Sequence, residues 1–272
     1  MCLSMGLYIN FQTGSSDPDS IMLVPKVNPK YPVRADPSDW RDNVYNFARS
    51  PLRDNVDMRN WASPVERQLH LGSCTGQATV GAYELLLNKD APDKFTDLSR
   101  LFVYYNARLL ENNVDSDIGA YVRDAIKGLK QYGVCSESYW PYNIENFART
   151  PSVSSYEDAK KRNIKKYYRI LNLDDILDAL NADRPVVFSM LVYDSFESLS
   201  DQTTIVPMPA ESESPIGGHA MCFVGYDLKK ELVLARNSFG PDWCMNGYCW
   251  IPFEYVKSET MDSWIFDIEL SI

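Results

Sequence analysis

Residues 68–87 read QLHLGSCTGQATVGAYELLL, and this stretch places Cys74 at the start of a helix. Gly72 and Ser73 interrupt regular backbone just before the cysteine, while residues 78–87 are mostly good helix formers. Free N–H groups and the dipole at a helix N-terminus stabilise negative charge, which lowers the pKa of a thiol from about 8.5 toward neutrality. The stretch therefore predicts a nucleophilic cysteine.

A thiol nucleophile needs a base, and the chain of 272 residues contains two histidines, His70 and His219. His70 lies four residues before Cys74, a separation at which the orientation for proton exchange is rare. His219 follows two glycines and begins the apolar run of residues 220–224, which predicts a buried strand. Asn237 ends another apolar strand, and its side-chain carbonyl can hold one imidazole nitrogen while the other faces the sulfur.

The order of these motifs resembles that of the papain-like cysteine peptidases. The matching pieces are Gln68, Gly72-Ser73-Cys74, Gly218-His219-Ala220, Asn237-Ser238 with Gly240, and Asn246-Gly247-Tyr248. The separation from Cys74 to His219 is 219 − 74 = 145 residues, within the roughly 130 to 150 typical of such enzymes, and Asn237 lies slightly beyond it. The sequences Gly72-Ser73-Cys74-Thr75 and residues 99–106 are similar to those of short bacterial members of the xylellain type, or of a viral-type member.

The resemblance implies a thiol peptidase that works through an acyl-enzyme. Cys74 would attack the carbonyl, His219 would protonate the leaving amine, and Asn237 would hold the imidazolium. The Cys74 backbone N–H and the Gln68 side chain would form the oxyanion hole. Peptide binding would involve five residues near the catalytic groups: Gly119, Ala120, Tyr121, Gly217 and Gly218. No metal or organic cofactor is expected, and whether the enzyme is an endopeptidase or an exopeptidase stays open.

Departures from the family pattern concern the surroundings of the catalytic residues. Leu71 and Asp117 occupy the places of a cysteine pair that secreted relatives join in a disulfide. Phe239 takes the place of a tryptophan that screens the bond between the catalytic asparagine and histidine. Two other functions stay open: a peptidase-like structural or binding component without turnover, and an acyltransferase or deamidase with the same triad.

The residue patterns and the resemblance predict an α+β, papain-like fold. Helices are expected over residues 76–88, 99–111 and 119–132, with a short one over 174–181. Strands are expected over residues 167–173, 185–192, 219–226, 232–237, 248–252 and 264–270, and residues 143–156 are expected to be irregular. We expect residues 51–272 to form the catalytic domain. Its helical lobe would span about 64–165, and its β lobe about 166–272 together with 51–63.

Composition sets limits on partners and compartment. The net charge of −10 argues against binding to nucleic acid or to anionic membranes. The chain lacks a run of eighteen apolar residues, and its N-terminus is a poor signal peptide. The five cysteines besides Cys74 match no family disulfide, so we expect a cytoplasmic or other reducing compartment, with virion association also open. A Cys244–Cys249 bridge is a minor alternative, and a metal site of His219, Cys222, Cys244 and Cys249 fits no zinc spacing.

Residues 1–50 contain many prolines and resemble an extended arm rather than a folded unit. Trp40, Val44, Tyr45 and Phe47 would be costly to leave in water, so we favour an arm packed on the enzyme body. A short pro-segment that covers the cleft or is cleaved off is the alternative.

Overall fold

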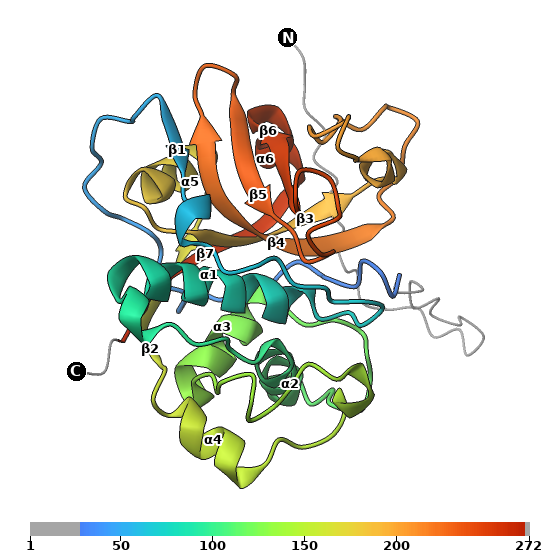
Figure 1. Cartoon of the computed structure of the whole chain (residues 1–272). Coiled ribbons are helices and arrows are strands. Elements are labelled where there is room, and N and C mark those ends of the chain that lie inside the picture. Colours follow the sequence, from blue (N-terminus) through green and yellow to red (C-terminus); the bar gives the residue numbers. More distant parts are fainter. Residues whose placement is uncertain (1–27, 270–272) are drawn as a thin grey trace.

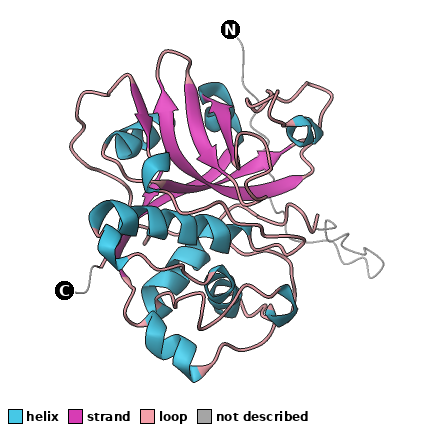
Figure 2. Cartoon of the chain, in the orientation of Figure 1, coloured by secondary structure: helices cyan, strands magenta, loops and turns pink. Residues whose placement is uncertain are grey.

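The structure is a computed structural model of the chain and describes residues 28–269. Helices gather in one lobe and strands in the other, as Figures 1 and 2 show. The α-helices of the first lobe are α1 (Cys74–Asp90), α2 (Arg100–Leu110), α3 (Val122–Tyr132) and α4 (Val153–Ala159). The division into a helical and a β lobe confirms the predicted papain-like α+β fold.

The second lobe is built on an antiparallel sheet with the order β2-β7-β3-β4-β5-β6, and β1 pairs with β4. The strands are β1 (Asn55–Asp57), β2 (Ile164–Ile170), β3 (Val186–Val192), β4 (Gly217–Asp227), β5 (Leu232–Arg236), β6 (Tyr248–Pro252) and β7 (Thr260–Ile268). Two helices, α5 (Leu173–Asn181) and α6 (Phe253–Glu259), pack against strands of this sheet. Four short 3-10 helices complete the elements of residues 28–269: η1 (Arg59–Trp61), η2 (Pro92–Lys94), η3 (Ile144–Asn146) and η4 (Asp194–Ser198).

Helix α1 lies between the two lobes and is buried on every side. All fourteen residues from Cys74 to Leu87 are buried, and α1 packs against α2 on one side and β4 on the other. The buried Glu84 carboxylate accepts from Ser63 Oγ (2.5 Å), from the Leu98 N–H (2.8 Å) and from Arg100 Nη2 (2.9 Å). Because the charge is paired and hydrogen-bonded, the fold tolerates it inside the lobe.

Element boundaries differ from the prediction where the sequence pattern is short. The segment expected to be irregular, residues 143–156, contains η3 and the start of α4. Helix α3 begins at Val122 rather than near Gly119, because residues 119–121 are non-helical backbone that leads into it. Strand β7 begins four residues earlier than expected, at Thr260.

The described part of the N-terminal arm, residues 28–50, starts along the boundary between the lobes and then runs beside the β lobe toward β1 (blue in Figure 1). Tyr45 anchors it through its N–H to the Arg169 carbonyl (2.8 Å) and its hydroxyl to Asp178 Oδ2 (2.6 Å). The expectation that the arm's aromatic residues pack on the body is right for Tyr45, which is 5% exposed, and wrong for Trp40, which is 93% exposed. Trp40 lies in a polar turn between Asp39 and Arg41, which form an ion pair with each other.

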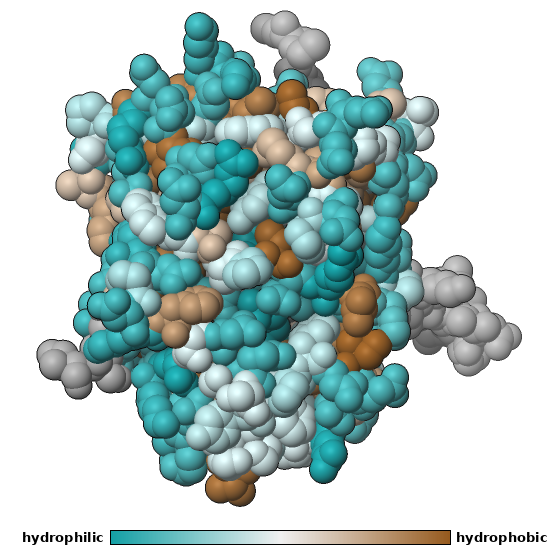
Figure 3. All heavy atoms as spheres, in the orientation of Figure 1, coloured by the Kyte–Doolittle hydropathy of each residue, from teal (hydrophilic) through white to brown (hydrophobic). Residues whose placement is uncertain are grey.

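The face of the molecule in Figure 3 is mainly polar, and the described cysteines form no disulfide. The face shown in Figure 3 is mostly hydrophilic, with apolar residues in small separate groups. The five cysteines in residues 28–269 are all free, and Cys2 lies outside the described range. Among those same residues, no helix is long and apolar enough to cross a membrane.

Candidate active site

Cys74 is the first residue of α1, as predicted, and it is completely buried. Ser73 holds the N-cap position, but its hydroxyl lies 2.5 Å from the Tyr142 hydroxyl and makes no capping bond. The side chain of Ser73 therefore leaves the first N–H groups of α1 free to stabilise an anion.

His219 and Asn237 come together from neighbouring strands. His219 lies in β4, Asn237 follows β5 directly, and His219 Nε2 lies 2.8 Å from Asn237 Oδ1. The Ser238 N–H also donates to Asn237 Oδ1 (2.8 Å), which fixes the carbonyl side of the amide toward the ring. Nε2 must then carry the proton, so Nδ1 is an acceptor, and within residues 28–269 it has no hydrogen-bond partner. The predicted hydrogen bond between Asn237 and His219 is confirmed.

Gln68 is held by hydrogen bonds to Ser238 and to Leu71, which lies three residues before Cys74. Its N–H donates to the Ser238 carbonyl (2.8 Å), its side-chain Oε1 accepts from Ser238 Oγ (2.6 Å), and its Nε2 donates to the Leu71 carbonyl (3.1 Å). Tyr142, which the sequence analysis missed, donates its hydroxyl hydrogen bond to the Gln68 carbonyl (2.9 Å). These bonds orient the Gln68 amide, and one of its two N–H groups remains for an oxyanion.

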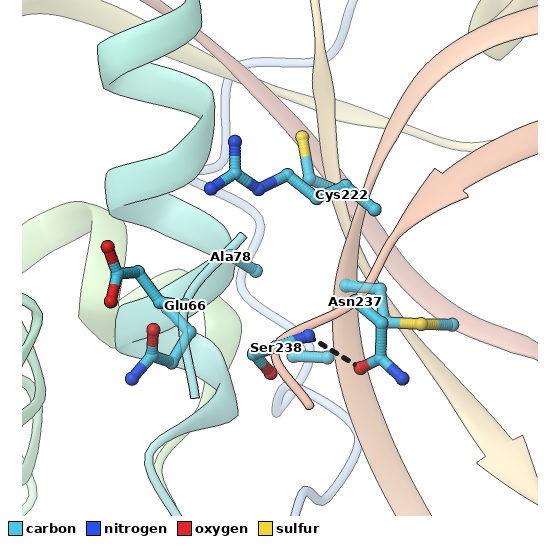
Figure 4. Close-up of a pocket in the computed structure, with 9 residues that line it drawn as sticks. Glu66, Ala78, Cys222, Asn237 and Ser238 are labelled. Carbon is cyan, nitrogen blue, oxygen red and sulfur yellow. Dashed lines mark hydrogen bonds between the residues drawn. The ribbon is translucent and has the colours of Figure 1, made fainter. Parts of the chain in front are cut away.

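A small cavity of about 10 Å³ lies beside these residues, between α1 and strands β4 and β5. Figure 4 shows Glu66 and Ala78 on its helix side and Cys222, Asn237 and Ser238 on its strand side, with the Ser238–Asn237 hydrogen bond drawn. This volume is near the lower limit for one water molecule, so the back of the site is tightly packed.

Burial dominates the electrostatics of the site. It raises the pKa of the Cys74 thiol to about 12, although backbone hydrogen bonds, the largest from Ala220, act in the opposite direction. Burial also lowers the pKa of His219 to about 4, against the effect of the Asn237 hydrogen bond. The sequence prediction of a thiolate near neutral pH is therefore wrong for this structure: the helix N-terminus is present, but the loss of solvent outweighs it.

The arm covers His219 and lies against Gly72, two residues before Cys74. Val33 N donates to the Gly218 carbonyl and Gly218 N to the Tyr31 carbonyl, both at 3.0 Å. The Tyr31 ring meets the His219 ring edge-on, with centroids 5.6 Å apart. On the opposite wall, a Cβ at Gly119 would lie 2.9 Å from Pro32 Cβ, so only a glycine lets the arm come this close.

The five residues expected to bind peptide all lie along this part of the arm. Gly217 and Gly218 contact the backbone of Tyr31 and Val33, and Gly119 contacts Pro32. Ala120 is buried beside Gly119, and the Tyr121 ring lies 4.5 Å beneath the guanidinium of Arg34. The described chain therefore already carries a peptide segment against the predicted binding residues.

Asp117 and Phe239, the two noted departures, both have a structural role. Asp117 accepts from the Gly72 N–H at 3.0 and 3.1 Å and from the Tyr104 hydroxyl at 2.6 Å. A carboxylate thus joins the cysteine loop to the segment around Gly119 without a disulfide. Phe239 stacks on His219 with centroids 5.0 Å and planes 29° apart, which covers the ring as expected.

Comparison with known proteins agrees with this fold and arrangement. Residues 52–263 match the papain family of cysteine proteases. The chain belongs to this family, whose members are peptidases that act on peptides or proteins.

Two similar proteins come from a virus and a bacterium. An uncharacterised peptidase C1-like protein of Acanthamoeba polyphaga mimivirus is 40% identical over 226 residues, 79% of this chain and 72% of that protein. The crystal structure of xylellain, a cysteine protease from Xylella fastidiosa, has a TM-score of 0.80 and 32% identity, covering 88% of this chain and 96% of that one. Bovine pro-cathepsin H is more distant, at 24% identity over 79% of this chain and 64% of its own length. The predicted likeness to xylellain-type or viral members is confirmed.

Proposed function

We propose that the protein hydrolyses peptide bonds through an acyl-enzyme on Cys74. The observation that carries the proposal is the packing of the α1 start, where Cys74 lies, on the strand that carries His219. Cys74 begins α1, the helix that packs on β4, and β4 carries the His219 ring whose Nε2 is held by Asn237 at 2.8 Å. The free Nδ1 is then the one nitrogen of the ring that can take the thiol proton.

Each step of the reaction has a residue suited to it. Once Nδ1 has taken the proton, the Cys74 thiolate attacks the carbonyl carbon. The oxyanion is stabilised by the Cys74 N–H and the Gln68 amide, where losing one donor typically costs about 2.7 to 4 kcal/mol. His219 then gives its proton to the leaving amine, and a water molecule, activated by the same ring, releases the acid and regenerates the thiol.

In this proposal residues 28–50 belong to a pro-segment that covers the cleft, and residues 51–272 form the catalytic domain. The neutral, buried pair of Cys74 and His219 suits a resting state, because water and substrate are both excluded. The packed-arm and cleft-covering interpretations are compatible: Tyr45 fastens the arm to the β lobe, while Tyr31 and Pro32 lie over the site.

The path of the arm also favours an endopeptidase. Lys30 contacts Glu197 at one end of the covered segment, and Arg34 contacts Glu111 and Tyr121 at the other. A polypeptide therefore extends past the catalytic residues in both directions, which an exopeptidase with a blocked cleft would not accommodate.

The test is cleavage of a pool of internally quenched peptides by the full chain. We compare the wild type, Tyr31→Ala to loosen the cover, and Tyr31→Ala combined with Cys74→Ala. Cleavage within the peptides by the second protein but not the third supports the proposal. No cleavage, despite a Cys74 thiol that reacts with iodoacetamide in the Tyr31→Ala chain, would favour a binding component without turnover. Transfer of the acyl group to an added amine in preference to water would favour an acyltransferase.

A further inference from the structure

Lys30 and Glu197 form an ion pair at one end of the covered segment. Lys30 Nζ lies 2.7 and 2.6 Å from the two carboxylate oxygens of Glu197, and the Tyr31 hydroxyl donates to the same carboxylate. The Glu197 side chain is 43% exposed even with the arm in place. A group from solvent can therefore reach this carboxylate once Lys30 withdraws.

Glu197 lies on the wall of the cleft that carries His219. Its neighbour Phe196 has its ring 6.3 Å from the His219 ring. Lys30 Nζ lies 5.6 Å from the centre of the Phe239 ring, which itself stacks on His219. A carboxylate and an aromatic face on one wall both attract a cation, by charge and by the ring quadrupole.

The proposed proton transfer from His219 determines which side of the substrate lies at that wall. His219 gives its proton to the leaving amine, so the residue that supplies this amine must lie on the His219 side of the scissile bond. A substrate in the cleft requires the arm to move, and Lys30 moves with it. Glu197 and Phe239 then lose their cation, and a basic side chain of the substrate can replace it.

We infer that Glu197 and Phe239 form a subsite for a lysine or arginine side chain on the leaving-group side of the scissile bond. The inference rests on the proposed function, because it needs His219 as the proton donor. A partly exposed ion pair combined with a cation–π contact favours a charged side chain over a neutral one roughly three- to tenfold. Salt should reduce the preference, because the carboxylate is open to solvent.

The test uses two full-chain proteins that both carry Tyr31→Ala to open the cleft, one with Lys30→Ala and one with Lys30→Ala combined with Glu197→Gln. Each is given quenched peptides that differ only in lysine or glutamine at the residue supplying the leaving amine. We expect the Lys30→Ala chain to cleave the lysine peptide with a kcat/KM roughly three- to tenfold higher, a ratio that falls toward one with added salt. The Glu197→Gln change should bring the ratio close to one. Asp194→Asn, an exposed carboxylate three residues earlier in η4, is the matched control and should keep the ratio.

A binding measurement separates this inference from the proposed function. In chains that also carry Cys74→Ala, fluorescence anisotropy of the same two peptides reports affinity without turnover. Tighter binding of the lysine peptide, lost with Glu197→Gln, supports the subsite even if no peptide is ever cleaved. Equal affinities, or a lysine preference that persists in the Glu197→Gln chain, would overturn it.

Discussion

Truncation of Tyr31 to alanine should open the active site to solvent. The Tyr31 side chain is 2% exposed and packs against His219, Phe196 and Phe239, with ring centroids 5.6, 6.3 and 6.4 Å away. Removing a buried aromatic ring typically costs about 3 to 5 kcal/mol, which weakens docking of the arm by roughly a hundredfold or more. We expect water to reach Cys74 in the variant.

The consequence is a faster reaction of the thiol. With a pKa of about 12, only about one Cys74 thiol in 10⁵ is ionised at pH 7, against about one in 10² for a thiol with its ordinary value of 9.0. If the thiol regained its ordinary pKa, alkylation of Cys74 would be up to about a thousandfold faster. The weaker docking of the arm predicts that the alkylation rate rises at least about a hundredfold. Lowering of the pKa by His219 and the helix N-terminus would add to this.

The assay is iodoacetamide labelling at pH 7, followed by peptide mass spectrometry of each cysteine. Trp40→Ala is the control, because it removes an exposed aromatic ring from the same arm and should leave the rate unchanged. A melting curve checks that Tyr31→Ala is folded. If Cys74 in a folded Tyr31→Ala chain labelled no faster than in the wild type, the arm would not be what buries the site.

Two further predictions concern the carboxylates of Asp36 and Asp117. Burial, together with the nearby Asp262 carboxylate, raises the pKa of Asp36 from 3.8 to about 7, so the folded arm favours the protonated form. Its contribution to the free energy of unfolding is present at low pH and is lost as pH rises to about 7, by up to about 1.4 kcal/mol per unit. Asp36→Asn should flatten this part of the melting temperature profile between pH 5 and pH 8, and an unchanged slope would contradict it. Asp117→Ala leaves the Gly72 N–H and the Tyr104 hydroxyl without their acceptor, so unfolding should become easier by about 2 to 4 kcal/mol, measured by urea titration. A loss below 0.5 kcal/mol, on the order of an ordinary surface change, would show that Asp117 does not fasten the cysteine loop.

The positions of the candidate site residues could be predicted from sequence because each leaves a local signal. Cys74 follows Gly72-Ser73 and begins a helix, and His219 and Asn237 lie near a strand start and just after a strand end, so spacing and residue type were sufficient. The hydrogen bond between His219 and Asn237 followed from the chemistry of the two side chains. The ionisation state of Cys74 did not follow, because it depends on what covers the sulfur.

The path of the arm depends on contacts that no local pattern records. Residues 31–33 fit the cleft because Gly119, Gly217 and Gly218 leave room for them, and these glycines are 86 or more residues away in the sequence. The pairing of Lys30 with Glu197 spans 167 residues. Such contacts require the fold itself, and the high exposure of Trp40 could not be predicted for the same reason.

The most direct test of Cys74 catalysis is capture of the acyl-enzyme. The Tyr31→Ala chain is mixed with a peptide ester, quenched with acid within seconds, digested and analysed by mass spectrometry. We predict that the peptide containing Cys74 carries the acyl group as a thioester, and that Cys74→Ala abolishes the adduct. The adduct should accumulate more slowly when His219 is replaced by alanine. Hydrolysis of the ester with no adduct on Cys74, or with the adduct on another cysteine, would contradict the assignment of Cys74 as the nucleophile.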